Sequence, residues 1–174
     1  MTAYPDTSTA DLRERAARVE LLVLDVDGVL TDGRFTLDEQ GSESKTFHTQ
    51  DGYGMRRLVE NGVQIAIITG RSSGAVTHRA QELGISFVFQ GCRDKQATIV
   101  ELMRDLGVKK DGCAAVGDDM PDQAMYQAAG LKIAVANAVP ELKALADMVT
   151  RRCGGDGAVR EVAEFILDAR RDAQ

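Results

Sequence analysis

The sequence predicts a three-layer α/β fold of the Rossmann type, with a parallel sheet, a β-hairpin insertion and no cap domain. Short, continuously apolar runs alternate with longer segments in which apolar residues recur at three- and four-residue spacing. Glycines directly follow several of these helical patterns, as helix C-terminal glycines do. One polar segment with two β-like arms interrupts the alternation. These three observations define the expected architecture.

The apolar runs have the character of buried parallel strands, because they offer no solvated face. The strands are expected at 21–26, 64–69, 87–90, 112–117 and 131–135, with a further short strand at 148–150. The helical patterns lie at 54–61, 74–83, 95–106, 121–129 and 158–170. Strand and helix in alternation imply right-handed crossovers between parallel neighbours.

The interrupting segment predicts a hairpin whose strands, 34–37 and 44–48, flank a polar, glycine-containing turn. The hairpin insertion covers about 33–48, and a C-terminal tail covers about 153–174. A chain of 174 residues is expected to form one domain, which covers 1–174.

Composition excludes several classes of partner. The 21 basic and 27 acidic residues give a net charge of −6, which argues against a nucleic-acid or anionic-membrane surface. No apolar run approaches the length of about 18 residues that a transmembrane helix requires, and the first 20 residues lack the apolar stretch of a signal peptide. Cys92, Cys113 and Cys153 are odd in number and widely spaced, which is typical of reduced thiols. We therefore expect a cytoplasmic protein.

Acidic residues follow two of the predicted strands. Asp25 and Asp27 end the first, and Asp118 and Asp119 end the fourth. Ligands of open parallel sheets bind at this edge. Two carboxylates about 4 Å apart repel by roughly 4 kcal/mol at an effective dielectric constant of 20. The cluster therefore needs a shared proton or a cation, and hard oxygen ligands favour Mg²⁺. The plainer interpretation is that Asp25 and Asp27 only cap the following turn.

Four segments resemble the four motifs of the haloacid dehalogenase superfamily of phosphotransferases, in order and over nearly the whole chain. They are Asp25 to Thr31, Thr69, Lys95, and Gly117-Asp118-Asp119-x-x-Asp122. Within the superfamily, the sequence is similar to the 3-deoxy-D-manno-octulosonate 8-phosphate phosphatase family. The stretches that carry this similarity are 24–33, 51–54, 67–71, 116–119 and 154–161.

The resemblance implies a Mg²⁺-dependent phosphatase that uses an aspartyl-phosphate intermediate. Asp25 is the expected nucleophile, which splits one difficult displacement into two. Asp27 is the expected acid for the leaving sugar oxygen and then the base for the attacking water. The side chains of Asp25 and Asp118, with the backbone carbonyl of Asp27, are the expected Mg²⁺ ligands.

The same resemblance assigns the phosphoryl oxygens to Thr69 and Lys95, a hydroxyl donor and a point charge. Asp119 and Asp122 are expected to orient Lys95 or the waters of the metal. A lysine early in a helix is more often solvated, and here Asp94 would be the helix cap. The position of Lys95 after the loop of the third strand, at the same sheet edge, favours the catalytic interpretation.

The implied substrate is 3-deoxy-D-manno-octulosonate 8-phosphate, a lipopolysaccharide precursor whose products are the free sugar acid and phosphate. Its carboxylate needs a cation, and the fork-shaped side chain of Arg71 beside Thr69 is the best candidate. The residues expected to bind substrate are Thr69, Gly70, Arg71, Lys95, Asp51 and Arg160.

Related sequences often have Arg in place of Gln50 and a basic residue in place of Asp156. Both departures remove positive charge near the expected pocket. They leave open a nine-carbon, sialic-acid-type sugar phosphate as the substrate.

The gaps of 44 residues from Asp25 to Thr69 and of 26 from Thr69 to Lys95 leave no room for a cap domain of about 50 residues. The resemblance implies a homotetramer in which the hairpin roofs a neighbour's site and the glycine-rich tail at 153–161 folds over that site. The hairpin residues Phe35, Leu37 and Phe47 would suit such an interface, or packing on the chain's own core.

Two other classes remain as alternatives. A receiver-type signalling domain also combines a phosphorylated aspartate with Mg²⁺, Thr and Lys, but it lacks an acid two residues after that aspartate, and Asp27 argues against it. A non-catalytic phosphatase-like assembly module often loses motif residues, whereas all of them are present here.

Overall fold

The computed structural model describes residues 9–173, so the two ends of the expected 1–174 domain lie outside the described residues. Within that part of the chain, six parallel strands form one sheet in the order β5-β4-β1-β6-β7-β8. The strands are β1 (Leu21–Leu24), β4 (Gln64–Ile68), β5 (Phe87–Phe89), β6 (Cys113–Gly117), β7 (Leu131–Ala134) and β8 (Met148–Val149). Each predicted strand of this sheet is present within two residues of its expected ends, and the fold class is confirmed.

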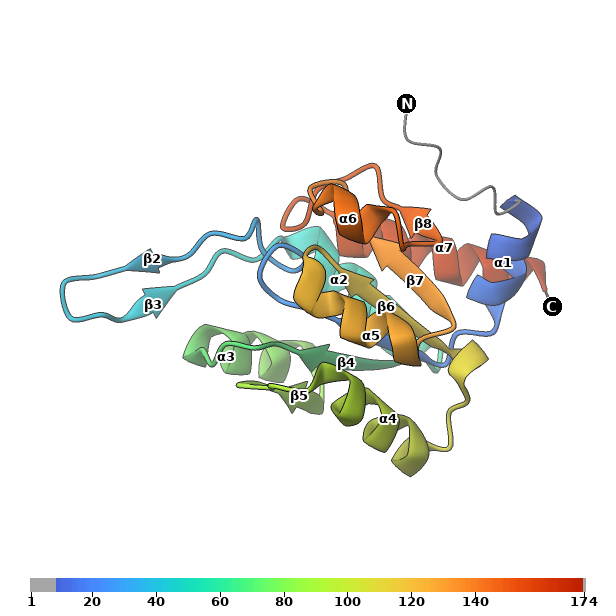
Figure 1. The fold of residues 1–174 in the computed structure, drawn as a ribbon, viewed down its shortest axis with the longest axis horizontal. Helices are drawn as coiled ribbons and strands as arrows, with labels where there is room; N and C mark the ends of the chain where they lie inside the picture. Colours follow the sequence, from blue (N-terminus) through green and yellow to red (C-terminus); the bar gives the residue numbers. More distant parts are fainter. Residues whose placement is uncertain (1–8, 174) are drawn as a thin grey trace.

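Helices cover both faces of this sheet (Figure 1). On one face α2 packs against α7, which also packs against α1, and on the other face α4 packs against α5. The helices are α1 (Thr9–Ala17), α2 (Thr49–Glu60), α3 (Gly74–Leu83), α4 (Lys95–Leu106), α5 (Gln123–Ala128), α6 (Pro140–Lys143) and α7 (Ala158–Asp172), with short 3-10 turns η1 (Lys110–Gly112) and η2 (Met120–Asp122). No helix among residues 9–173 is long and apolar enough to cross a membrane.

The helix α1 was not expected, because four of its nine residues are charged and only Ala16 is buried. Ion pairs add to the packing of Leu12 and Ala16 on the core: Arg15 lies 2.6 Å from Asp147, and Arg13 lies 2.5 Å from Asp172. Such long-range pairs leave no periodic pattern in the sequence.

Two further boundaries differ from the expectation. The helix expected at 54–61 begins five residues earlier, because His48 caps it by accepting a hydrogen bond from the Gln50 amide. The helix expected at 121–129 is divided into η2 and α5, and α6 was not expected at all.

The hairpin projects from the body beyond the carboxyl ends of the strands (Figure 1). Its strands are β2 (Thr36–Leu37) and β3 (Glu43–Ser44), which pair antiparallel as expected but over fewer residues. The second strand was predicted to continue to residue 48. It ends early because Lys45 turns its side chain inward and Phe47 packs against the core.

The glycine-rich segment at 153–157 is packed on its own chain. The Gly154 amide donates to Asn137 Oδ1 at 2.6 Å, and the Gly155 amide donates to the Val29 carbonyl at 3.1 Å. A Cβ at Gly154 would lie 1.7 Å from the Gly28 carbonyl oxygen. The segment therefore supports the loop that follows β1, and only glycine permits this approach.

The rest of the C-terminal tail is part of the core. Seven residues of α7 are buried, and they follow the spacing of one helix face. They are Ala158, Val159, Val162, Ala163, Ile166, Leu167 and Ala169.

Candidate active site

A pocket of about 520 Å³ opens at the carboxyl ends of the strands. Its volume lies within the range of about 300–1,000 Å³ that is usual for small-molecule sites. Nine of the predicted site residues line this one pocket: Asp25, Asp27, Thr69, Gly70, Arg71, Lys95, Asp118, Asp119 and Asp122.

A tight turn after β1 presents Asp25 and Asp27 to the pocket. The Thr31 hydroxyl joins the turn internally, because its Oγ1 lies 3.4 Å from both the Val26 carbonyl and the Gly28 amide. Gly28 has a φ of +96°, a conformation that residues with a Cβ rarely adopt. The conformation of the turn therefore depends on Gly28 and Thr31 within it and on Gly154, which packs against it.

Lys95 is not a solvated lysine. Asp94 caps α4 by accepting from the Ala97 amide at 2.9 Å, as expected. The Lys95 side chain is only 8% exposed, and its Nζ donates to Asp25 Oδ1 at 2.6 Å and to Asp122 Oδ1 at 2.7 Å. The structure thus brings a buried ammonium directly to the expected nucleophile.

Asp122 connects Lys95 to the loop after β6. While its Oδ1 accepts from Lys95, its Oδ2 accepts from the backbone amides of Asp118 at 2.9 Å and Asp119 at 3.4 Å. Asp119 does not contact Lys95: it is exposed, and its carboxylate accepts from the Met120 amide to cap η2. Of the two acids expected to orient Lys95 or the waters of the metal, only Asp122 contacts Lys95.

The acids of the pocket carry more negative charge than Lys95 can neutralise. Burial, and then the charge of Asp122, raise the pKa of Asp25 to about 6, although Lys95 opposes this shift. Burial, and then Asp122 and Asp25, raise the pKa of Asp118 to about 7. Burial lowers the pKa of Lys95, but Asp25 and Asp122 more than offset it and raise that pKa overall.

The carboxylates fit a hard divalent cation. Oxygen atoms of Asp25, Asp118 and Asp122 lie within 4.8 Å of one another. Both oxygens of Asp122 already accept hydrogen bonds, so Asp25 and Asp118 are the side chains free to bind an ion. A Cβ at Gly28 would lie 2.0 Å from Asp118 Oδ2, so the turn after β1 directly contacts this carboxylate. An all-oxygen set of this kind is what Mg²⁺ prefers.

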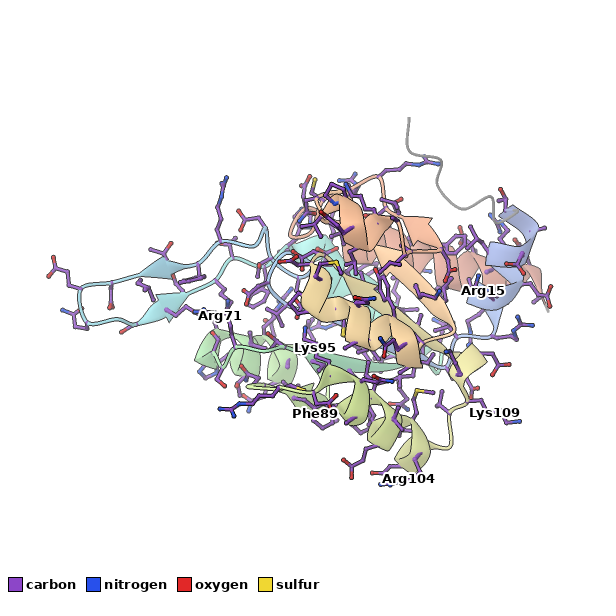
Figure 2. The ribbon with its side chains drawn as sticks, in the orientation of Figure 1. Arg15, Arg71, Phe89, Lys95, Arg104 and Lys109 are labelled. Atoms are coloured by element: carbon purple, nitrogen blue, oxygen red, sulfur yellow. The ribbon has the colours of Figure 1, made fainter. Side chains whose placement is uncertain are left out.

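The hairpin supplies the other wall of the pocket. Lys45 Nζ forms an ion pair with Asp27 Oδ1, and Arg71 Nη2 lies 2.6 Å from Glu43 Oε2. Figure 2 shows Arg71 beside the hairpin. The sequence analysis missed Lys45 and Glu43, because only the hairpin's return toward the body brings them to Asp27.

Thr69 lies at the end of β4 with 2% exposure, and its Oγ1 accepts from the Arg71 amide at 3.4 Å. The loop that carries Gly70 is attached to β5 and the loop after it, because the Thr69 amide donates to the Phe89 carbonyl and the Cys92 amide donates to the Thr69 carbonyl. Thr69 and Gly70 are therefore fixed beside Asp25, as expected.

Two residues expected to bind substrate do not lie in this pocket. Asp51 is buried in the first turn of α2, where its Oδ1 accepts from the Arg160 amide at 2.7 Å and ties α2 to α7. The Arg160 guanidinium lies 4.7 Å from the centre of the Tyr53 ring and 2.6 Å from Glu164. Both residues have partners within the fold, away from Asp25.

The two departures from the family pattern also lie outside the pocket. Gln50 lines a separate hollow between α1, β8 and α7. Asp156 is exposed, with its carboxylate 3.9 Å from His48. Neither departure changes the charge of the pocket within one chain.

Comparisons with known proteins agree with this geometry. Residues 87–162 match the haloacid dehalogenase-like hydrolase family. The 3-deoxy-D-manno-octulosonate 8-phosphate phosphatase of Yersinia pestis is 44% identical over 170 residues, which cover 95% of this chain and 91% of that protein.

Solved structures show the same fold. The Moraxella catarrhalis 3-deoxy-D-manno-octulosonate 8-phosphate phosphatase, in complex with magnesium, phosphate and the sugar acid, superposes with a TM-score of 0.92 at 42% identity and covers 95% of both chains. The cobalt-bound Haemophilus influenzae phosphatase has a TM-score of 0.88 at 36% identity, covering 90% of this chain and 92% of that one. This chain therefore belongs to the 3-deoxy-D-manno-octulosonate 8-phosphate phosphatase family of haloacid dehalogenase-like hydrolases.

Proposed function

We propose that this chain hydrolyses 3-deoxy-D-manno-octulosonate 8-phosphate to the free sugar acid and phosphate, in the synthesis of lipopolysaccharide precursors. The observation that carries the proposal is the buried contact of Lys95 with Asp25, beside Asp118, in the pocket at the sheet edge. The likeness to phosphatases with this substrate in their names supports the choice of substrate.

In the proposed mechanism, Asp25 attacks phosphorus and forms an aspartyl-phosphate. Lys95 holds Asp25 in place and, with the Thr69 hydroxyl, neutralises charge on the phosphoryl oxygens as it develops. Asp27 gives a proton to the departing sugar oxygen and then takes one from the water that hydrolyses the intermediate. Attack and protonation thus come from two acids that are two positions apart after β1.

Mg²⁺ is the proposed cofactor, held by the side chains of Asp25 and Asp118 and by the backbone carbonyl of Asp27. When bound, it supplies positive charge that lets the carboxylates and a phosphate share one site. Asp122 is proposed to act through others, because it orients Lys95 and the amides of the Asp118 loop.

Arg71 is the proposed partner of the sugar carboxylate, with Gly70 beside it. It lines the pocket next to Thr69, and its side chain is 48% exposed, so a substrate can reach it. The fork of a guanidinium matches a carboxylate in geometry as well as in charge.

We also propose a cytoplasmic homotetramer, in which the hairpin reaches a neighbouring subunit's site. Phe35 and Leu37 support an interface there, because 41% and 56% of these residues stay exposed in one chain. The free thiols of Cys92, Cys113 and Cys153 agree with a reducing compartment. Leu37→Glu should weaken assembly, which sedimentation velocity would detect.

A panel of sugar acid phosphates tests the proposed function. Phosphate release is measured from eight- and nine-carbon 2-keto sugar acid phosphates with Mg²⁺ present. We expect the highest kcat/KM for 3-deoxy-D-manno-octulosonate 8-phosphate. A higher value for a nine-carbon, sialic-acid-type substrate would contradict the proposal for the substrate but not for the chemistry.

A further inference from the structure

Lys45 is a buried charge that the mechanism above does not use. Its side chain is 1% exposed, its Nζ forms an ion pair with Asp27 Oδ1, and the same Nζ lies 3.3 Å from Glu43 Oε1. An ammonium group loses its hydration when it is buried, and only close partners of opposite charge compensate for that loss. The fold therefore gives Lys45 a specific position, directed at Asp27.

The contact makes the two oxygens of Asp27 unequal. Oδ1 is held by Lys45, whereas Oδ2 lies 3.8 Å from Arg71 Nε, beyond hydrogen-bond distance. An ammonium has three donors and no acceptor, so an oxygen in contact with it must act as an acceptor. A proton on the Asp27 carboxyl group is therefore confined to Oδ2.

Lys45 is itself held in place. Glu43 lies between Lys45 and Arg71, and its Oε2 accepts from Arg71 Nη2 at 2.6 Å. The ring of Phe35 contacts both cations, with its centre 4.1 Å from Arg71 Cζ and 5.5 Å from Lys45 Nζ. Hydrogen bonds, above all from Arg71, lower the pKa of Glu43 to about 2, so Glu43 stays ionised at neutral pH.

We propose that Lys45 is a positioning residue for Asp27, which fixes the orientation of that carboxyl group and directs its proton to Oδ2. The inference rests on the proposed function, because it takes Asp27 as the general acid. In the step concerned, a bond forms between Asp25 and phosphorus while the bond from phosphorus to the sugar oxygen breaks. The sugar oxygen keeps that electron pair and takes the proton from Asp27 Oδ2.

The test compares two leaving groups in the Lys45→Met variant. A sugar alkoxide needs a proton in order to leave, whereas 4-nitrophenolate leaves readily without one. The ratio kcat/KM covers the steps up to release of the leaving group, so it isolates the acid role of Asp27 from its later role as a base. We expect kcat/KM for the sugar phosphate to fall about 10- to 100-fold, part of the 10²–10⁴-fold that a general acid contributes.

For 4-nitrophenyl phosphate we expect a change of less than about threefold. Lys109→Met removes an exposed lysine at the opposite end of the sheet and should leave both substrates unchanged. An equal loss for both substrates would show that Lys45 only supports the fold, and no loss for either would show that Asp27 does not need it. Each of these two results overturns the inference.

Two further variants keep the test decisive if Lys45→Met does not fold. Lys45→Arg restores a cation and should return the sugar phosphate rate to within about fivefold of the native rate. Glu43→Gln weakens the support of Lys45 and should lower the ratio of the two rates about threefold. An unchanged ratio in Glu43→Gln, or an equal large loss of both rates in Lys45→Arg, would overturn the inference.

Failure of the proposed function would be visible separately. That function is judged on phosphate release by the native chain and by Asp25→Asn, whereas the inference depends only on the ratio between an alkyl and an aryl phosphate. Any alkyl phosphate that the native chain hydrolyses can serve for this ratio.

Discussion

The two walls of the pocket are built in different ways. The inner wall consists of Asp25, Lys95 and Asp122, whose side chains are at most 8% exposed. Asp25 directly follows β1, Lys95 begins α4, and Asp122 lies in η2. The outer wall consists of long side chains from the hairpin and the loop after β4, among them Lys45 and the half-exposed Arg71. Both walls pair carboxylates with cationic side chains, but the pairs of the inner wall are buried, whereas Arg71 of the outer wall is half-exposed.

Because of this difference, we expect the inner wall to govern the reaction and the outer wall to govern which substrate binds. Charges that are removed from water interact strongly, so a change on the inner wall affects both the reaction and the stability of the fold. Charges that face solvent are screened, so a change on the outer wall should mainly affect which substrate binds. Lys45 lies between these cases, because it belongs to the hairpin but is buried against Asp27.

Replacing the proposed nucleophile should have the largest effect. Asp25→Asn keeps the shape of the side chain but removes the nucleophilic carboxylate, so we expect kcat to fall more than about 1,000-fold for every phosphate ester. Phosphate release from a sugar phosphate and from 4-nitrophenyl phosphate measures the loss. Asp111→Asn, an exposed acid in η1, is the matched control. One tenth of the native activity in Asp25→Asn would rule out the assignment.

Removing the buried ammonium should have the next largest effect. Lys95→Met leaves Asp25 and Asp122 facing each other without a cation, and breaking a buried pair costs about 3–5 kcal/mol. We expect kcat to fall about 100-fold and the Tm of the Mg²⁺-free protein to fall by roughly 6 °C or more. Calorimetry and steady-state kinetics measure both effects. A Tm equal to that of Lys109→Met would contradict the buried-pair interpretation.

The inner wall was largely predictable from the sequence, because it follows from topology. Once Asp25 and Asp118 are assigned to the carboxyl ends of neighbouring parallel strands, the sheet brings them together. Lys95 required one further step, its position after the loop of the third strand at this same edge, because its place early in a helix alone favoured a solvated side chain. The apolar runs placed the strand ends, and the family resemblance supplied the roles of Lys95 and Asp122.

The outer wall and the tail were less predictable, because they depend on contacts between distant segments. Nothing within the hairpin sequence shows that Lys45 turns back to Asp27, 18 positions earlier. The glycines near Gly154 have no side chain whose character shows what they contact, and in the structure they permit close packing against Gly28. Arg160 likewise lies outside the pocket of its own chain and pairs with Glu164 on the same helix.

Binding of Mg²⁺ should stabilise the inner wall in a pH-dependent way. The pKa values of Asp25 and Asp118 are about 6 and about 7, above their ordinary value of 3.8. The folded, Mg²⁺-free protein therefore keeps protons that the unfolded chain releases, and its stability falls as the pH rises from about 4 to about 7. A bound cation relieves this repulsion, and it competes with protons for the same oxygens.

We expect saturating Mg²⁺ to raise the Tm by about 5–10 °C at pH 8, since ligand at 100 times its Kd contributes about 2.7 kcal/mol. At pH 5 the increase should be close to zero. Thermal unfolding at both pH values, with and without Mg²⁺, measures the difference. Equal increases at the two pH values would contradict the coupling, and Asp118→Asn should remove most of the increase at pH 8.

The smallest of these effects should come from the outer wall, where Arg71→Met tests selection without chemistry. In the proposed mechanism, Arg71 contacts the sugar carboxylate and none of the atoms that react. Its half-exposed guanidinium already has Glu43 as a partner. A substrate carboxylate therefore replaces a screened ion pair rather than filling an empty site, so the gain is modest. We expect KM for the sugar acid phosphate to rise about tenfold, or about 1.4 kcal/mol, with kcat nearly unchanged. A sugar phosphate without the carboxylate should show no change in KM, and Arg104→Met, an exposed arginine on α4, should change neither constant. Because uniform binding is lost, the fall in kcat/KM should come from KM alone; a fall in kcat instead would place Arg71 with the chemistry of the inner wall and remove the distinction between the two walls.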